Sequence, residues 1–532
     1  MHDLGDPSFP YPSTVRPVVG RNMVVASQPL AAQAGLRMLE LGGNAVDAAI
    51  TAASVIAVVE PTNNGLGGDA FAAVWDGDTL SGLNASGRAP GRASPERMME
   101  KYGNTMPERG WDSVTVPGAV SAWTALWRRY GSLSFEQLMA PAITYAADGF
   151  FVSPGVAQKW EEQADVLRNQ PNFETVFLPG GKAPLTGQCF VQADLAETLA
   201  RIARSEGRDF YTGTTAARIA AFSAECNADL SREDLASHRA VWTDMLGTRY
   251  RDACAYEMPP NGQGLIALYA LGILEHLKIE QHPVDSPEAI HLQIEAIKLA
   301  CAQVQGQLGD PDQMTASPAE LLHPDHTRHA ASMIDMKHAQ DYRHKLPALA
   351  GTVYLATGDS TGRMVSLIQS NYMGFGSGVV VPGTGIALQN RGAGFSLDMN
   401  SPARLSPKAR PFHTILPGFL SGADGSHMAF GATGGAFQPQ GHVQLVVRLM
   451  SFRQNPQAIV DAPRFKVASG LKVSLEPGYP LSTVHALTEL GHQITALGTS
   501  TWDFGGMQIL QRQGNCYIGA RDARRDSHVA VS

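Results

Sequence analysis

The chain has 532 residues, of which 44% are hydrophobic and 17% charged, and its formal net charge is −8. This length can bury a large core and suggests two to four domains. An acidic balance without a long basic run argues against nucleic acid and anionic membranes as main partners.

Cysteine usage and the N-terminal residues indicate the compartment. The five cysteines, Cys189, Cys226, Cys254, Cys301 and Cys516, are scattered and form no CxxC pair. We therefore expect free thiols in a reducing environment. The start, MHDLGDPSFPYPST, lacks the basic and apolar parts of a secretory signal. A cytoplasmic protein is the expectation.

Two helices are predicted near the start. Residues 29–43 place apolar side chains at helical spacing and end on two glycines, a common helix stop. Asn44 can cap a second helix over residues 45–59. That apolar run is too short to cross a bilayer comfortably, so a buried helix is expected. A Gly-rich turn at 65–68 then leads into a strand.

The middle of the chain is more varied. Residues 110–300 mix helices and strands, and Ser286 followed by Pro287 marks the start of a helix. Residues 306–350 are polar, His-rich and without a strong period. We predict a mobile, partly helical segment there.

From residue 352 the pattern becomes β. Residues 352–371 contain two strand-like runs around a Gly-Asp-Ser-Thr-Gly turn, which predicts a hairpin. Residues 377–388 continue the β character, and a helix is expected within 434–452.

Several motifs carry weak signals. HPDHTRH spaces His323, His326 and His329 three apart, but the proline and the lack of a Cys or HExxH pattern favour a solvated loop over a metal site. The Gly-rich stretches match no nucleotide fingerprint. In GATGGAF, Gly434 and Gly435 could form a plain turn or aim backbone N–H groups at an oxyanion. No GxSxG motif is present.

Thr352 follows Gly351 at the junction of a loop and a predicted strand. Taken alone, it is a structural β-branched residue. Its context differs, because the chain resembles the γ-glutamyltransferase family over almost its whole length. The matching stretches follow the family's order: GGNAVDAAI at 43–51, GLGGDAF at 65–71, VPGAVSAW at 116–123, APAITYAADGFFV at 140–152, MPPNGQG at 258–264, LGDP at 308–311, GFGSGVVVPGTGIALQN at 374–390, FGATGGAFQPQ at 430–440 and DAPRF at 461–465.

The resemblance implies an N-terminal nucleophile hydrolase, an α+β protein folded as a four-layer αββα sandwich. Such a proenzyme cuts itself once, before a threonine that falls here on Thr352. Cleavage after Gly351 would leave a large subunit of 351 residues (1–351) and a small subunit of 181 residues (352–532). The two subunits would stay intertwined in one domain.

Thr352 can carry out both the self-cleavage and the later catalysis. Thr352 Oγ can attack the Gly351 carbonyl to give an ester that water hydrolyses, and a residue without Cβ tolerates the strained geometry. The freed amine, with a reference pKa of about 7.7–8.0, then accepts the hydroxyl proton, so Thr352 is both nucleophile and base. By resemblance, Gly434 and Gly435 donate to the oxyanion, and Ser370 can bond the new amine.

The chain departs from the family's pattern at the residues that bind an amino-acid donor substrate. The arginine that binds the donor carboxylate aligns with Ser86, while Arg88, two residues on, is either a substitute or a solvated charge. The acidic partner of the donor ammonium aligns with Gly394. Other expected residues are also replaced, an asparagine by Tyr372 and paired serines by His413 and Thr414.

A buried ammonium without a partner is costly, so the pocket suits a bare carboxylate. Arg391, His413 and Arg88 are candidates to bind it, with Tyr372 and Thr414 beside them; His413 could instead be a neutral internal histidine. In these positions the chain is more similar to the family's divergent acylases and amidohydrolases, and that resemblance implies an amidohydrolase acting on small acidic acyl amides, such as glutaryl amides or oxamate, without metal or cofactor. A γ-glutamyl hydrolase or transpeptidase with glutathione-like donors is the alternative, and an unprocessed, inactive homologue with a binding role is the alternative from another class.

Overall fold

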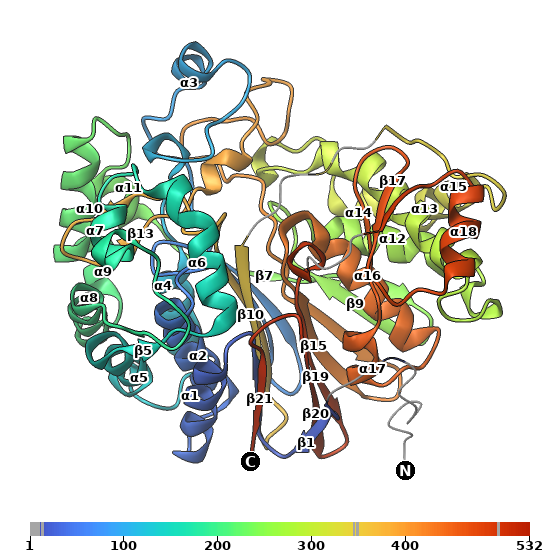
Figure 1. The fold of residues 1–532 in the computed structure, drawn as a ribbon, viewed down its shortest axis with the longest axis horizontal. Coiled ribbons are helices and arrows are strands. Elements are labelled where there is room, and N and C mark those ends of the chain that lie inside the picture. The colour runs from blue at the N-terminus through green and yellow to red at the C-terminus, as the bar shows by residue number, and fades with distance from the viewer. Residues whose placement is uncertain (1–10, 12–14, 344–345, 347–350, 497–500) are drawn as a thin grey trace.

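The structure is a computed structural model that describes residues 11, 15–343, 346, 351–496 and 501–532. Two seven-stranded sheets lie face to face in the centre, and helices cover the outer side of each (Figure 1). The predicted four-layer αββα arrangement is confirmed.

Both sheets combine strands from before and after Thr352. The first has the order β21 (His528–Val531), β2 (Met23–Ala26), β10 (Gly351–Gly358), β11 (Met364–Tyr372), β3 (Asp69–Trp75), β4 (Leu80–Asn84), β7 (Val241–Asp244). The second has the order β1 (Val18–Gly20), β20 (Cys516–Arg521), β19 (Met507–Gln513), β15 (His427–Ala432), β14 (Gly418–Gly422), β9 (Ala253–Glu257), β8 (Leu246–Tyr250). Neighbouring strands in both sheets run antiparallel.

Three smaller sheets lie outside this pair. They are β5 (Phe150–Phe151) with β6 (Cys189–Phe190), β12 (Val380–Val381) with β13 (Ile386–Ala387), and β16 (Phe465–Val467) with β17 (Lys472–Leu475) and β18 (Gln493–Ala496).

The helices form two separate layers (Figure 1). Against the first sheet lie α1 (Pro29–Glu40), α2 (Ala45–Val59), α4 (Ala119–Tyr130), α5 (Phe135–Asp148), α6 (Pro154–Leu167), α7 (Phe173–Phe177), α8 (Ala193–Arg204), α9 (Arg208–Thr212), α10 (Thr214–Glu225) and α11 (Arg232–Ser237). On the side of the second lie α12 (Gly264–Glu275), α13 (Pro287–Val304), α14 (Pro318–Leu321), α15 (Pro324–Ser332), α16 (Gln438–Met450), α17 (Pro456–Asp461) and α18 (Leu481–Glu489). A short helix, α3 (Pro95–Tyr102), packs on a small cluster of its own.

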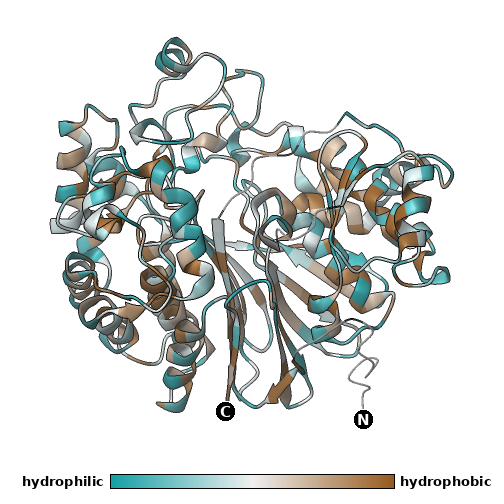
Figure 2. Cartoon of the chain, viewed as in Figure 1, coloured by the Kyte–Doolittle hydropathy of each residue, from teal (hydrophilic) through white to brown (hydrophobic). Residues whose placement is uncertain are grey.

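Strand alternation explains how one chain fills three apolar layers. In β10, Val353 and Leu355 pack toward the first helical layer, whereas Tyr354 and Ala356 lie between the sheets. Successive side chains of a strand point to opposite faces, so a strand covered on both faces is apolar throughout. Hydrophobic residues accordingly follow the central strands and the helices beside them (Figure 2).

The predicted helices at the start of the chain are confirmed. Asn44 accepts hydrogen bonds from the Val46 and Asp47 amides, and Asp47 accepts one from the Asn44 amide, which completes a capping box for α2. Every residue of α2 is buried. Ser286 caps α13, as expected. None of the helices in the described part of the chain has the length and apolar character of a membrane span.

The hairpin and the late helix are also confirmed, as β10 with β11 and as α16. The cysteines are free thiols, as predicted. The solvated loop expected at HPDHTRH is wrong, because His323 caps α15 through its ring and the helix buries Thr327 and Ala330. Some of the predicted mobile segment, residues 344–345 and 347–350, lies outside the described residues.

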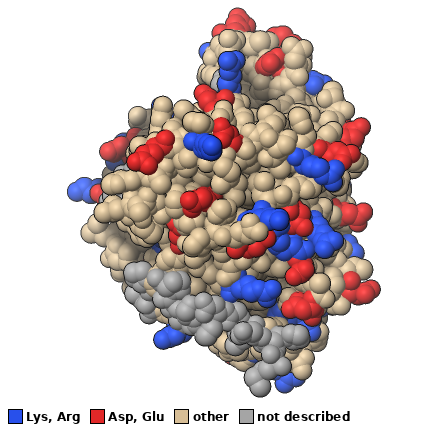
Figure 3. Space-filling view, turned by 90° about the vertical axis from the view of Figure 1, so that its right-hand side faces the viewer, with Lys and Arg blue, Asp and Glu red and all other residues tan. Residues whose placement is uncertain are grey.

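On the face drawn in Figure 3, side chains of both charge signs are scattered among neutral ones. Neither sign gathers into one continuous field on that face.

Candidate active site

Thr352 is the second residue of β10 and stands at a break in strand register. Gly351 pairs with Tyr372, and Val353 pairs with Gln369, so one residue of β10 faces two of β11. Tyr372 has a left-handed backbone with φ of 77°. A β-bulge of this kind bends the strand and redirects side chains. It lets the Ser370 hydroxyl reach the Gly351–Thr352 peptide.

Two hydroxyls converge on the Gly351 carbonyl oxygen. Ser370 Oγ donates to it over 2.6 Å and Thr352 Oγ1 over 2.7 Å. The nucleophile therefore lies beside the carbonyl that it would attack, while Ser370 polarises that carbonyl. A Cβ on Gly351 would come within 2.5 Å of Asn63 Oδ1, so a larger residue would have to displace the Asn63 side chain.

The predicted oxyanion donors lie in a turn that follows β15. Gly434 and Gly435 have φ of 106° and 58°, a conformation that favours glycine. Among the described residues, neither N–H has a backbone acceptor. Gln263 fixes the turn, because its Nε2 donates to Gly435 O over 2.9 Å and to Thr414 O over 2.7 Å.

A cavity of about 290 Å³ joins these parts. It is lined by Gly351, Thr352, Thr433 and Gly434, by the neutral residues Thr62, Asn63, Gln163, Met373 and Gly374, and by the charged residues Glu108, Arg109, Lys159, Asp503 and Arg525. Arg109 donates to Gly374 O and to Gln163 Oε1 over 2.8 and 3.0 Å. These partners are neutral.

Arg391 lies behind the nucleophile and is fully buried. Its guanidinium donates to Thr414 Oγ1 over 3.0 Å and to Ser370 Oγ over 3.4 Å, and it stacks 4.1 Å from the centre of the Tyr372 ring. Burial lowers the pKa of Arg391 to about 10, against the opposing effect of Tyr372 and Asp69. The group therefore remains cationic at neutral pH.

His413 occupies the same buried layer, paired with Asp69 over 3.1 Å through Nε2. Its Nδ1 accepts from the Ile415 amide at 3.5 Å, so Nε2 carries the proton. Burial, followed by the charges of Arg391 and Arg410, holds the pKa of His413 well below its usual range. Burial likewise raises the pKa of Asp69 to about 7. His413 is thus a neutral, internal histidine here.

Two positions that align with the family's donor site lie elsewhere. Arg88 does not line the cavity at Thr352; it donates to Lys408 O over 2.8 Å and pairs with Asp310 at 3.6 Å, beside a different cavity. Ser86 is buried and accepts from Arg410 over 2.8 Å. The fold therefore brings together Thr352, Ser370, Tyr372, Arg391 and Thr414, and leaves Arg88 apart.

Three residues of the site went unnoticed in the sequence. Asp69 and Gln263 stand inside GLGGDAF and MPPNGQG, and those motifs could have drawn attention to them. Arg109 offered no such signal, because its partners Gly374 and Gln163 are distant in the chain.

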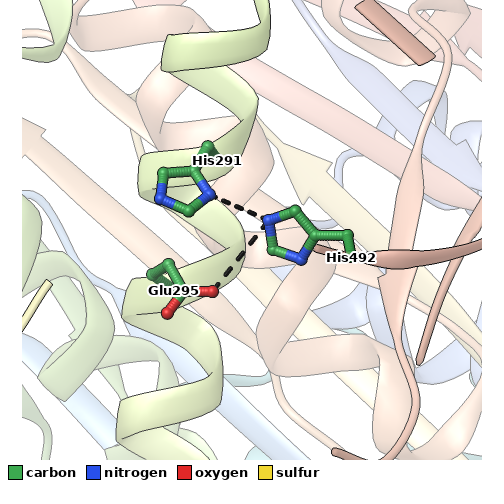
Figure 4. A group of neighbouring side chains, drawn as sticks. All are labelled: His291, Glu295 and His492. Carbon is green, nitrogen blue, oxygen red and sulfur yellow. Dashed lines mark hydrogen bonds and ion pairs between the residues drawn. The ribbon is translucent and has the colours of Figure 1, made fainter. Parts of the chain in front are cut away.

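Another buried cluster resembles a metal-ligand set (Figure 4). His291 and Glu295 on α13 lie near His492, with ligand atoms within 4.8 Å of one another. However, the Lys298 ammonium lies 2.5 Å from Glu295 Oε1 and supplies a cation. His291 Nδ1 and His492 Nε2 are hydrogen-bonded at 2.8 Å. The cluster joins α13 to the turn after α18.

The family model described as gamma-glutamyltranspeptidase matches residues 31–532. The chain belongs to the γ-glutamyltranspeptidase family. It is 35% identical to the glutathione hydrolase-like YwrD proenzyme of Bacillus subtilis (strain 168), over 90% of this chain and 93% of that protein. It is also 35% identical to the oxamate amidohydrolase proenzyme of Klebsiella pneumoniae, over 96% and 98%. A crystal structure of cephalosporin acylase from Bacillus halodurans superposes with a TM-score of 0.93 at 42% identity, covering 100% of this chain and 99% of that one.

Membership confirms the N-terminal nucleophile hydrolase fold and places the chain in a family of hydrolase and transpeptidase enzymes. Family membership favours an enzyme over the inactive-homologue alternative. The proenzyme names of the relatives and the structural matches are consistent with two processed fragments that stay associated. They are also consistent with a small-molecule amide substrate.

Replacing Ser370 tests its role in self-cleavage. Ser370→Ala removes the donor to the Gly351 carbonyl, and losing one oxyanion donor slows acyl transfer by about 10²–10³-fold. We expect fragment formation to slow by that order, measured by denaturing electrophoresis of freshly synthesised precursor. Ser370→Thr should restore the rate, and Ser360→Ala, in the exposed hairpin turn, is the matched control. Equal rates for Ser370→Ala and wild type would contradict the assignment.

The Lys298–Glu295 pair gives a prediction about stability. Lys298→Met leaves a buried carboxylate unpaired, which typically costs about 3–5 kcal/mol. The double variant Glu295→Leu/Lys298→Met removes both charges and should recover most of that loss. Urea denaturation measures both. If Lys298→Met is as stable as wild type, the Lys298 ammonium is not the cation that neutralises the Glu295 carboxylate.

Proposed function

We propose that this enzyme hydrolyses amides whose acyl group carries a free carboxylate close to the scissile carbonyl, and that Arg391 binds that carboxylate. The proposal rests on the family membership of the chain and on the surroundings of one buried guanidinium.

The supporting observation is the set of groups that surround the Arg391 guanidinium. Its hydrogen-bond acceptors among the described residues are the hydroxyls of Ser370 and Thr414, and its buried Nε has none. Arginine binds carboxylates with paired, charge-assisted bonds. Arg391 lies behind the cavity and is not part of its lining, so the proposed contact requires local movement after cleavage.

Position favours a short acyl group. The Ser370 hydroxyl bridges the Arg391 guanidinium and the Gly351 carbonyl oxygen. Only one hydroxyl therefore separates the cation from the carbonyl that Thr352 attacks in self-cleavage. In the processed enzyme, an acyl group on Thr352 Oγ would place a carboxylate near Arg391 after one to a few carbons.

The proposed cycle uses groups already in place. The free amine of Thr352 takes the proton of its own hydroxyl, and Oγ attacks the substrate carbonyl. The Gly434 and Gly435 N–H groups stabilise the tetrahedral oxyanion. The intermediate collapses, the C–N bond breaks, and the leaving amine takes the proton. Water then attacks the acyl ester in the same way, which releases the carboxylic acid and regenerates Thr352.

A γ-glutamyl donor is the second candidate, because Glu108 and Asp503 line the cavity at Thr352. Either carboxylate could pair with a donor ammonium. Relatives named glutathione hydrolases belong to the same family, so a direct comparison of substrates is required.

The test compares p-nitroanilides of glutaryl, γ-glutamyl and valeryl groups, together with ammonia release from oxamate. We expect the glutaryl substrate or oxamate to give the highest kcat/KM. Arg391→Lys keeps the charge but loses the paired geometry; losing charge-assisted bonds of about 1.5–3 kcal/mol predicts a fall of roughly 10- to 150-fold for carboxylated acyl groups. Valeryl anilide should change much less.

Arg92→Met, at an exposed position outside the cavity, is the control and should leave all substrates unaffected. Preference for the γ-glutamyl anilide, or an equal loss on glutaryl and valeryl anilides in Arg391→Lys, would contradict the proposed role of Arg391.

A further inference from the structure

A second cavity, of about 240 Å³, shares no lining residue with the one at Thr352. Four basic side chains line it: Arg88, Arg239, Lys408 and Arg410. They come from three separate stretches of a chain whose overall charge is −8. Positive charge is therefore concentrated in this cavity.

The nearby carboxylates are already engaged. Asp234 accepts from the Gly91 amide at 2.8 Å and from the Ser231 amide at 2.9 Å, where it completes the cap of α11. Asp310 accepts from the Arg410 amide at 2.5 Å and pairs with Arg88 at 3.6 Å. Among the described residues, Asp234 is therefore the one carboxylate that lines the cavity beside its four basic side chains, although Asp69, Asp310 and Asp312 also act on Arg410 from outside the lining.

Neutral groups complete the wall. The Arg410 side chain is 7% exposed and donates to the oxygens of Asn84 and Ser86, which carry no charge. His238 adds no cation, because burial and then the charges of Arg410, Arg239 and Arg88 lower its pKa to about 3.

Arg88 and Lys408 both present exposed side-chain surface. Arg88 donates to the Lys408 carbonyl over 2.8 Å, and its side chain remains 42% exposed. Lys408 itself has φ of 62°, a conformation that is uncommon for a residue with a Cβ. In the described part of the chain, no group pairs with the Lys408 ammonium, which leaves it available to a ligand.

We propose that this cavity binds a small oxyanion, such as phosphate or a dicarboxylate. Arginine forks present paired N–H donors that match phosphate and carboxylate oxygens, and lysine adds a point charge. Arg410 would supply buried donors to the site, and Arg88 and Lys408 exposed ones. None of the residues that line this cavity lines the cavity at Thr352, so this site is separate from that cavity.

Isothermal titration calorimetry with inorganic phosphate, at constant ionic strength set with chloride, tests the proposal on processed enzyme. We expect saturable binding at one site per chain. Arg88→Met/Lys408→Met should weaken it at least tenfold, whereas Arg37→Met/Lys337→Met, which removes two exposed cations elsewhere, should not. Lys408→Glu, an exposed single change, provides a second variant if the first does not fold.

Further titrations distinguish the source of the anion. Succinate binding more tightly than phosphate would identify a dicarboxylate ligand, and a phosphate monoester binding more tightly than both would identify a phosphorylated metabolite. No saturable heat with any of them, or equal affinity in wild type and both variants, would overturn the proposal. The Arg88→Met/Lys408→Met variant separates this site from the carboxylate site proposed at Arg391, because only binding that the variant weakens belongs to this cavity.

Discussion

The site depends on one hydrogen bond, from the Ser370 hydroxyl to the carbonyl oxygen of Gly351. It exists because the bulge in β11 brings Ser370 opposite the peptide before Thr352. The same hydroxyl contacts Arg391, so the geometry of self-cleavage and that of the proposed substrate pocket share one atom. A change at this position should therefore affect both the making of the enzyme and its turnover.

Strand pairing explains how the fold can tolerate a break in its centre. β10 begins at Gly351 and lies between β2, from the part before the cleavage site, and β11, from the part after it. The second sheet mixes β8 and β9 with β14 and β15 in the same way. Separating the fragments would expose apolar layers and unpaired strand edges on both sides. Cleavage frees an amine without removing the contacts that position it.

Local patterns predicted much of the fold. Asn44 and Ser286 act as caps through hydrogen bonds with residues two or three positions on, so their neighbours in the sequence were sufficient. The start of α15 was missed, because a histidine ring serves as its cap in place of the usual Ser, Thr, Asp or Asn.

The site was only partly predictable. Alignment of motifs found Thr352, Ser370, Gly434 and Gly435, since each lies in a stretch that resembles the family. It could not show that Arg88 faces another cavity, which depends on contacts with residues more than 200 positions away. The partners of the Asp69 carboxylate could not be predicted either, because His413 and Gln389 come from distant segments of the chain.

The most direct measurement is the intact mass and N-terminal sequence of the purified, active enzyme. The account predicts two chains, of 351 and 181 residues, with Thr352 as the first residue of the smaller, and a single inactive chain for Thr352→Ala. A single uncut polypeptide that hydrolyses amides at the normal rate, or full activity in Thr352→Ala, would contradict it.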